Sequence, residues 1–350
     1  MPLPVDLPIE PMLAKAVATV PERAPGGGAL LYEPKWDGFR AIVAFDGQTV
    51  EIGSRGGKSL TRYFPDLVDA FATALPGPCV LDGEVIVRRG ESGAERLDWE
   101  ALSQRIHPAA SRVAKLAQET PASFVAFDLL ADADRGMLEL PFGDRRAALE
   151  SFLGAPAAPL HLTQVTSDAE LATRWLTTFE GAGLDGIVAK PVDAPYTPGK
   201  RVMLKVKHAR TADVVVTGYR THASGTGVGS LLLGLYTDDG TLAHVGGVSA
   251  FSDVRRRQLV DELAPLLLRD DHGEPVRQQG EKNRFNSAKD VSFAVLRPER
   301  VMEVRYDQME GSRFRHTAQF ERWRPDREPR SCTFEQLEVP TAYDLASILR

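Results

Sequence analysis

Short runs of β-branched and aromatic residues, separated by turn residues, constrain the fold of this chain more than any other feature. Residues 42–45 and 49–52 flank Asp46-Gly47, and an Asp-Gly pair between two such runs predicts a β-hairpin. Helices are expected at residues 97–106 and 168–179, the second beginning with a capping box of Ser167 and Glu170. Further strand-like runs lie at residues 80–87, 124–130, 161–165, 186–190 and 202–206. Helices mixed with hairpins predict an α+β domain with mostly antiparallel sheets.

The pattern changes after Lys207. Several strand-like runs follow one another with turn residues between them, and one helix is expected, at residues 253–268. Short strands with a single helix are typical of a small β-barrel of the OB type. The runs are residues 214–216, 231–236, 242–248, 291–296 and 301–306. We therefore predict two domains, residues 1–207 and residues 208–350, with the Pro- and Gly-rich residues 2–28 as an extended arm.

Composition excludes several classes of protein. A chain of 350 residues with 43% hydrophobic and 26% charged residues is typical of a globular protein with two cores. Cys79 and Cys332 are too few for a disulfide framework, which favours a reducing, cytoplasmic location. Neither a signal peptide nor a membrane-spanning apolar run is expected, so we predict no membrane partner. The formal net charge of -6 disfavours a protein that coats nucleic acid but permits a local basic track.

Lysine is scarce in this chain. Of 42 basic residues 10 are Lys, which leaves 42 − 10 = 32 Arg. Five of the lysines fall in two short stretches rich in Gly and acidic residues, at positions 35, 190, 200, 205 and 207. Arginine keeps its charge, whereas lysine can lose its proton and act as a nucleophile. An isolated lysine after a strand is usually a surface residue, so Lys35 gains meaning only from its context.

That context is a series of motifs in a fixed order. Lys35-Trp36-Asp37-Gly38-Phe39-Arg40 is followed by Ser54-Arg55-Gly56, Leu81-Asp82-Gly83-Glu84, Phe127-Asp128, Asp185-Gly186-Ile187-Val188-Ala189-Lys190, Lys205-Val206-Lys207 and Arg322-Trp323-Arg324-Pro325-Asp326-Arg327. Together they resemble the nucleotidyltransferase motifs of ATP-dependent DNA ligases. Within that family the chain is similar to the small bacterial ligase C group, which has only an adenylation domain and an OB-fold domain. The resemblance covers essentially the whole chain.

The residue types also suit this chemistry independently of the family. A lysine amine must lose its proton before it attacks phosphorus, and nearby cations such as Arg40, Lys205 and Lys207 favour the neutral form and offset phosphate charge. Glu84 and Asp185 are candidate Mg²⁺ ligands, since magnesium commonly takes one or two carboxylates with phosphate oxygens. Each residue also has a plainer interpretation, because Phe127 could be a core residue and the two lysines could lie on a solvated strand face. The spacing of the histidines indicates no zinc site.

The resemblance implies specific roles. Lys35 forms a covalent lysyl-AMP, and Asp37, Arg40, Lys205 and Lys207 complete the catalytic set. Glu84 and Asp185 bind the metal, Mg²⁺ or Mn²⁺. The ATP-binding residues implied in this way are Glu33, Arg40, Arg55, Glu84, Phe127, Lys205, Lys207 and Arg324.

The sequence departs from the family at two of these motifs. Position 185 is Asp where Glu is usual, which keeps the charge but shortens the reach. Position 327 is Arg where Lys is usual, which keeps the cation but changes its hydrogen-bonding geometry. We interpret both as tolerated variants of an active enzyme.

The expected function is sealing of nicks with a 3′-hydroxyl and a 5′-phosphate, through lysyl-AMP and DNA-adenylate, in DNA repair and recombination. Nicked duplex DNA is the expected partner, contacted through its phosphates by arginines, and other repair proteins are candidate partners of a monomer. The candidate arginines are residues 313, 315, 322, 324, 327 and 330. Two alternatives stay open at this stage: an RNA ligase or another covalent nucleotidyltransferase, and a catalytically inactive OB-fold nucleic-acid binder.

Overall fold

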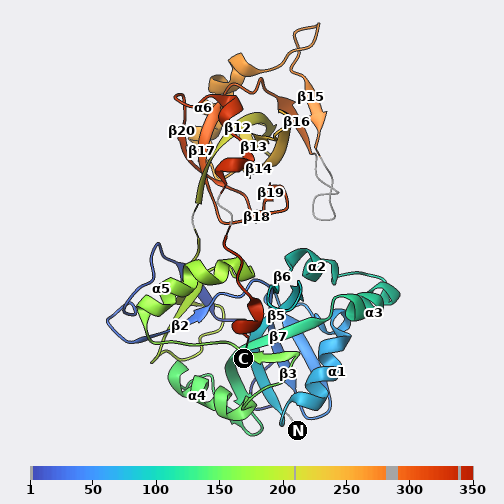
Figure 1. Ribbon diagram of the computed structural model, residues 1–350, viewed down its shortest axis with the longest axis vertical. Coiled ribbons are helices and arrows are strands. Elements are labelled where there is room, and N and C mark those ends of the chain that lie inside the picture. Colours follow the sequence, from blue (N-terminus) through green and yellow to red (C-terminus); the bar gives the residue numbers. More distant parts are fainter. Residues whose placement is uncertain (1–2, 209, 281–290, 338–339, 350) are drawn as a thin grey trace. The chain divides into compact units, whose positions relative to one another are not determined.

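A computed structural model describes residues 3–208, 210–280, 291–337 and 340–349 (Figure 1). The chain divides into two compact units. The first contains Met1–Lys207 together with Pro340–Arg350, and the second contains His208–Val339. The division after residue 207 coincides with the predicted boundary. The prediction that the second domain continues to residue 350 differs from the structure, because the last residues pack into the first unit.

The first unit contains two β-sheets. Its strands are β1 (Leu13–Ala16), β2 (Leu30–Pro34), β3 (Phe39–Phe45), β4 (Val50–Ser54), β5 (Cys79–Arg89), β6 (Arg96–Leu97), β7 (Ala122–Asp132), β8 (Arg135–Gly136), β9 (Leu160–Leu162), β10 (Ile187–Pro191) and β11 (Arg201–Val206). The larger sheet has the order β4-β3-β5-β7-β8, with β6 on β5 and β9 on β7. The smaller sheet has the order β1-β11-β10-β2. Most neighbours are antiparallel, and the pairs β1–β11 and β7–β9 are parallel.

The larger sheet is buried on both faces, which explains why its strands are nearly continuous apolar runs. In β3, Val43 belongs to a core that includes residues of helices, whereas Ile42 and Ala44 belong to a core shared with the smaller sheet. Successive strand residues point to opposite faces, so this alternation builds two cores from one strand. Met203 of β11 lies in the second of these cores, which places the two sheets face to face.

The helices of the first unit are α1 (Pro65–Ala74), α2 (Trp99–Gln104), α3 (Ala110–Glu119), α4 (Phe142–Leu153) and α5 (Ala169–Thr178). Leu67 and Phe71 of α1 and Leu149 of α4 pack on the larger sheet. None of the helices in the described part of the chain has the length and apolar composition needed to cross a membrane.

The C-terminal segment is part of the first unit. Leu345 and Ile348 are fully buried in the core that also contains Trp36 and Phe127. Gln164 fixes the backbone of this segment, because its Nε2 donates to the carbonyl oxygens of Ser347 at 3.2 Å and Ile348 at 3.0 Å. The chain therefore leaves the first unit after residue 207 and returns to it at residue 340.

The second unit is a β-barrel of the OB type with one α-helix in its described part, α6 (Asp253–Leu263). The long strand β12 (Arg210–Thr221) organises it, since β12 pairs with β13, β16 and β17. The other strands are β13 (Val228–Tyr236), β14 (Leu242–Val248), β15 (Arg277–Gln279), β16 (Ser292–Val295), β17 (Val301–Tyr306), β18 (Met309–Glu310), β19 (Arg313–Phe314) and β20 (Gln319–Trp323). Its own core includes alternate residues of β13, Leu231, Leu233 and Leu235, together with residues of other strands and of α6.

The predicted hairpin is confirmed, since β3 and β4 pair antiparallel around Asp46-Gly47. The predicted cap of the helix at 168–179 is wrong. Asp168, and not Ser167, is the N-cap of α5, and its carboxylate accepts from the backbone N–H of Glu170 and Leu171. The extended arm at residues 2–28 also needs correction, because it contains β1, which pairs with β11. Helices α1, α3 and α4 were not predicted.

The docked C-terminal segment should contribute to the stability of the first unit. We expect Leu345→Ala to lower the free energy of unfolding by about 2–5 kcal/mol, the usual cost of removing a buried leucine side chain. Urea unfolding measures the effect, and Leu7→Ala is the control because Leu7 is 41% exposed. Equal small losses in both variants would show that the segment does not hold the unit together.

His161 in β9 gives a pH prediction for the same unit. Its Nε2 is buried without a partner, and burial together with the positive charge of Arg88 lowers its pKa to about 4. The ordinary pKa is about 6.5, so in the window between these values the unfolded chain binds a proton that the folded chain does not. Stability should therefore fall as pH falls through this window, by on the order of 3 kcal/mol.

Comparison with His161→Gln tests this prediction. The variant should lose less of its free energy of unfolding than the wild type between about pH 7 and about pH 4. His272→Gln, which replaces an exposed histidine, should behave like the wild type. Identical pH profiles for all three proteins would contradict the prediction.

Candidate active site

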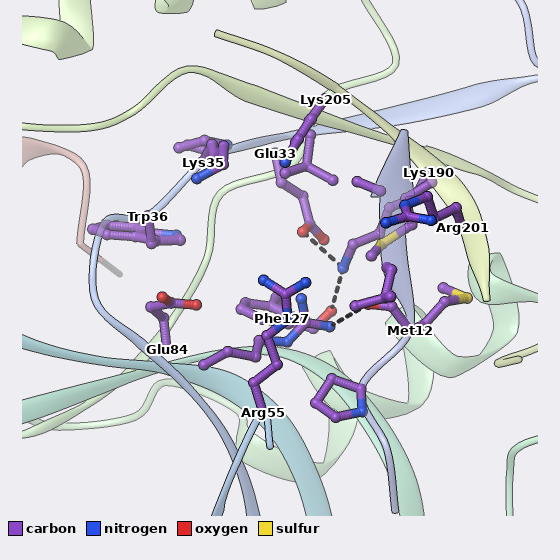
Figure 2. A pocket seen from close by; sticks show the side chains of 17 residues that line it. Met12, Glu33, Lys35, Trp36, Arg55, Glu84, Phe127, Lys190, Arg201 and Lys205 are labelled. Carbon is purple, nitrogen blue, oxygen red and sulfur yellow. Dashed lines mark hydrogen bonds and ion pairs between the residues drawn. The ribbon is translucent and has the colours of Figure 1, made fainter. Parts of the chain in front are cut away.

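A cavity of about 220 Å³ opens between the two sheets of the first unit (Figure 2). The larger sheet contributes Arg40, Glu84 and Phe127 to its walls, and Arg55 follows β4. Residues 11–14 and the smaller sheet form the opposite side, and Lys35 and Trp36 follow the end of β2. The remaining lining residues are Glu33, Pro34, Val188, Lys190, Arg201, Met203 and Lys205.

Lys35 is held by its own backbone and by an ion pair. Its N–H donates to the carbonyl of Gly186 at 2.8 Å, and its carbonyl accepts from the N–H of Asp185 at 2.9 Å. The Nζ of Lys35 lies 2.5 Å from Oδ2 of Asp185. Gly186 permits this arrangement, because its φ is +130° and a Cβ there would collide with the carbonyl of Val206. The two segments are thus locked together before any ligand binds.

Asp185 also contacts a second lysine. Lys207 Nζ lies 2.9 Å from the same Oδ2, so one carboxylate oxygen serves two ammonium groups. The shorter side chain of Asp at this position is therefore long enough to reach both lysines. Lys205, two residues before Lys207, has a lowered pKa because it is partly buried and because Lys35 and Lys207 repel its charge. Three lysines and one carboxylate make this end of the cavity strongly cationic.

Glu84 lies on β5 close to the loop that carries Lys35. Its Oε1 accepts from the N–H of Gly38 at 3.2 Å. Gly38 comes so close to β5 that a Cβ would collide with the carbonyl of Val85. Burial raises the pKa of Glu84 to about 7, although Arg40 and Lys35 favour its charged form.

Arg40 and Phe127 form the floor of the cavity. Asp82, which is fully buried, accepts from Nε and from one terminal nitrogen of Arg40, both at 2.5 Å. The guanidinium carbon lies 4.6 Å from the centroid of the Phe127 ring. Lys190 Nζ lies 4.6 Å from the same centroid, so two cations contact this aromatic ring.

Glu33 and Lys190 form a buried ion pair at the back of the cavity (Figure 2). Their charged atoms are 2.8 Å apart, and Lys190 also donates to the carbonyl of Phe127 at 3.1 Å. Burial outweighs Lys190 and Arg146 and raises the pKa of Glu33. Its Oε1 has no hydrogen-bond partner, since Arg146 is 3.8 Å away.

Most of the residues predicted from the sequence meet at this cavity. Its walls include Glu33, Lys35, Arg40, Arg55, Glu84, Phe127 and Lys205. Asp185 and Lys207 lie behind Lys35 and reach the cavity through their ion pairs. Asp37 is next to Lys35 in sequence but is not one of the lining residues.

Arg324 belongs to the second unit. It pairs with Asp213 at 2.9 Å and with Asp326 at 2.9 Å, and Arg327 lies 3.6 Å from Asp213. The hydrogen bond from Arg324 lowers the pKa of Asp326 to about 2. The replacement of Lys by Arg at position 327 thus leaves a cation next to Asp213.

Sequence reasoning missed several lining residues. Lys190 ends a recognised motif but was not assigned to the site, and its lysine identity in an Arg-rich chain was the available signal. Met12 and Arg201 carried no comparable signal. Trp36 also lines the cavity, and it is 4% exposed with its Nε1 donating to the hydroxyl of Thr163 at 2.8 Å.

Within the described residues no three His, Cys, Asp or Glu side chains gather around one point. A metal cage built by protein alone is therefore not present in this part of the chain. Glu84 and Asp185 fit the other arrangement, in which one or two carboxylates share a magnesium ion with phosphate oxygens and water.

Comparison with known families decides the identity. Residues 11–207 match the ATP dependent DNA ligase domain, and residues 224–327 match the ATP dependent DNA ligase C terminal region. The chain belongs to the ATP-dependent DNA ligases. It is 55% identical to DNA ligase C1 of Mycolicibacterium smegmatis, over 100% of this chain and 99% of that protein. It is 53% identical to DNA ligase C of Mycobacterium tuberculosis, with the same coverage of both chains.

A solved structure of a Lig E DNA ligase supports the fold of this ligase. Its TM-score is 0.57 at 18% identity, and the match covers 91% of this chain and 100% of that chain. The predicted combination of an adenylation domain and an OB-fold domain is confirmed. The relatives and family models favour a DNA ligase over the RNA ligase and the inactive binder considered above.

The Glu33–Lys190 pair allows a stability prediction for the ligase. We expect Lys190→Met to lower the free energy of unfolding by about 3–5 kcal/mol, because it leaves a buried carboxylate without its partner. Lys115→Met is the matched control, since Lys115 pairs with Glu119 on an exposed helix surface and should cost less than about 1 kcal/mol. Chemical denaturation measures both changes. Adding Glu33→Gln to Lys190→Met should recover part of the loss, and no recovery would contradict this explanation.

Proposed function

We propose that this ligase seals nicks through a covalent Lys35–AMP intermediate. The observation that carries the proposal is the Lys35–Asp185–Lys207 cluster at one end of a cationic cavity. A lysine that is fixed by its backbone and surrounded by cations suits attack on a phosphate.

The reaction proceeds in three transfers. The Lys35 nitrogen attacks the α-phosphorus of ATP, an N–P bond forms, the bond to pyrophosphate breaks, and the amine gives up its proton. The 5′-phosphate of the nick then attacks the same phosphorus, and the N–P bond breaks as lysine regains a proton. Finally the 3′-hydroxyl attacks the 5′-phosphate: an O–P bond joins the two strand ends, the hydroxyl gives up its proton, and the phosphoanhydride bond breaks so that AMP leaves. Each transfer has a good leaving group, which is the advantage of the covalent route.

The cavity residues receive roles that fit their positions. Phe127 offers an aromatic face to adenine, with Glu33 at the back of the cavity. Arg40 and Arg55 contact ribose or phosphate, and Lys205 and Lys207 offset the charge of the α-phosphate. Asp37 completes the motif next to Lys35, and Arg324 of the second unit acts on the pyrophosphate.

A divalent cation is part of this proposal. Glu84 and Asp185 would hold Mg²⁺ or Mn²⁺ together with phosphate oxygens, and the ion would supply positive charge to the departing pyrophosphate. In the structure both carboxylates interact with lysine or backbone N–H groups. Protein groups therefore hold Oε1 of Glu84, which lines the cavity, and Oδ2 of Asp185, which lies behind Lys35.

The DNA partner is nicked duplex, held through its phosphates by arginines of the second unit. Ion pairs within the second unit already engage Arg322, Arg324 and Arg327. Arg322 pairs with Glu303 at 2.6 Å, and Arg324 and Arg327 pair with Asp213. Phosphate contacts by these side chains would compete with carboxylates of the same unit, so DNA affinity should fall as salt rises.

We also propose that the ligase acts in the cytoplasm, as a monomer, in DNA repair and recombination together with other repair proteins. Cys79 and Cys332 are buried and unpaired, which suits a reducing compartment.

Labelling with ATP tests the proposal directly. Incubation with α-labelled ATP and Mg²⁺ should give acid-resistant label on the wild type and none on Lys35→Arg, because the guanidinium keeps the charge but is not a nucleophile at neutral pH. Lys58→Arg, at an exposed position, is the matched control and should label normally. Addition of nicked duplex DNA should discharge the label and yield sealed product. An unlabelled wild type, or a labelled Lys35→Arg variant, would refute the mechanism.

A further inference from the structure

A closed ring of hydrogen bonds lies behind the cavity and joins four distant parts of the chain. Asp82 accepts from Arg40 at 2.5 Å and from the hydroxyl of Tyr196 at 2.6 Å. That hydroxyl accepts from the backbone N–H of Met12 at 3.0 Å, and the carbonyl of Met12 accepts from Arg40 at 3.3 Å. Two members of the ring, Arg40 and Met12, line the cavity, whereas Tyr196 and Asp82 do not.

We propose that Tyr196 is a positioning residue for nucleotide binding, acting through Asp82 on Arg40 and through Met12 on the wall formed by residues 11–14. This inference rests on the proposed function, in which the cavity binds ATP. Tyr196 is not one of the residues that line the cavity. Its hydroxyl can therefore influence a bound nucleotide only through its hydrogen-bond partners, Asp82 and Met12.

The residues around Tyr196 hold its hydroxyl in one position. The residue is 3% exposed, its N–H donates to Leu138 at 2.8 Å, and the guanidinium of Arg145 lies 5.5 Å from its ring centroid. Burial and the negative charge of Asp82 raise its pKa well above the ordinary value, so the hydroxyl keeps the proton that it donates. A protonated, immobile hydroxyl can donate and accept at the same time.

Met12 joins the ring to the edge of the smaller sheet. It is 1% exposed and precedes β1, an edge strand that pairs only with β11 in the smaller sheet. Loss of the Tyr196 hydroxyl would leave the buried Met12 N–H without its acceptor and Asp82 without one of its donors. Buried groups without partners are costly, so the wall would shift towards other partners and Arg40 would lose its alignment.

This role separates binding from chemistry. The ring contains neither Lys35 nor Asp185, and its cavity cation Arg40 contacts ribose or phosphate in the proposed function, so breaking the ring leaves the Lys35–Asp185 ion pair in place. A Tyr196→Phe variant should therefore bind ATP more weakly while transferring AMP at nearly the normal maximal rate. A merely structural tyrosine would instead lower thermal stability without changing the KM for ATP.

Tyr32→Phe is a matched control. Tyr32 is 1% exposed, belongs to the same unit, and donates to the carbonyl of Pro21 at 2.6 Å, away from the cavity lining. Both variants remove one hydroxyl and one short donated hydrogen bond, and Tyr196→Phe also removes the acceptor of the Met12 N–H. Only Tyr196→Phe should raise the KM for ATP in the labelling reaction, by about tenfold, with the maximal rate within about twofold of the wild type. The melting temperature of both variants is measured alongside.

A double-mutant cycle links the effect to Arg40. Arg40→Lys alone should also raise the KM for ATP, and the effect of Tyr196→Phe should shrink in that background because both changes act through Asp82. Additive effects would overturn the proposal, as would an unchanged KM in Tyr196→Phe or an equal rise in Tyr32→Phe.

An equilibrium measurement keeps the inference independent of catalysis. Calorimetric binding of ATP to Lys35→Ala, with and without Tyr196→Phe, reports on the cavity even if no protein becomes labelled. Binding weakened by about tenfold supports the role of Tyr196, and unchanged binding refutes it. Absence of label on the wild type, with normal ATP binding, would refute only the proposed function.

Discussion

The face-to-face packing of two β-sheets is the constraint on which the rest of the first unit depends. The larger sheet needs cover on both faces because its strands are apolar on both. Helices supply one cover and the smaller sheet supplies the other, with Ile42 and Met203 in the shared core. The cavity lies where the two sheets carry polar residues instead of apolar ones. The charged residues of the cavity therefore interrupt an otherwise hydrophobic interface, and rigid strands hold them in place.

Charge distribution within that cavity is uneven, and this gives the two ends different tasks. At one end one oxygen of Asp185 pairs with both Lys35 and Lys207. Two ammonium groups therefore face a single carboxylate, and the excess positive charge favours the binding of phosphate groups. At the other end the Glu33–Lys190 pair is fully buried and leaves one carboxylate oxygen without a hydrogen bond. That oxygen is itself buried and lies 3.8 Å from Arg146, and Lys190 also donates to the carbonyl of Phe127, so the pair fixes this part of the cavity wall.

The C-terminal segment adds a connection that a simple two-domain description lacks. The chain enters the second unit after residue 207 and comes back at residue 340, so both ends of that unit are attached to the first. Leu345 and Ile348 are buried in the same core as Trp36, the neighbour of Lys35. The packing of that core thus depends on residues from opposite ends of the sequence.

Sequence patterns by themselves determined the family, the order of the motifs, the hairpin at Asp46-Gly47 and several residues of the cavity, among them Lys35, Arg40 and Phe127. Local rules suffice for these features, because turn chemistry and strand alternation act over a few residues and the motifs carry the residue types that phosphoryl transfer needs. They did not place helix α4, whose buried side includes Arg145 and Arg146 and so lacks an apolar stripe. Only the tertiary structure paired Glu33 with Lys190, closed the ring through Met12 and Tyr196, and returned the C-terminal segment to the first unit. Each of these contacts joins residues that are more than a hundred positions apart, and their partners are selected by which strands lie side by side and by the cost of leaving buried polar groups unpaired.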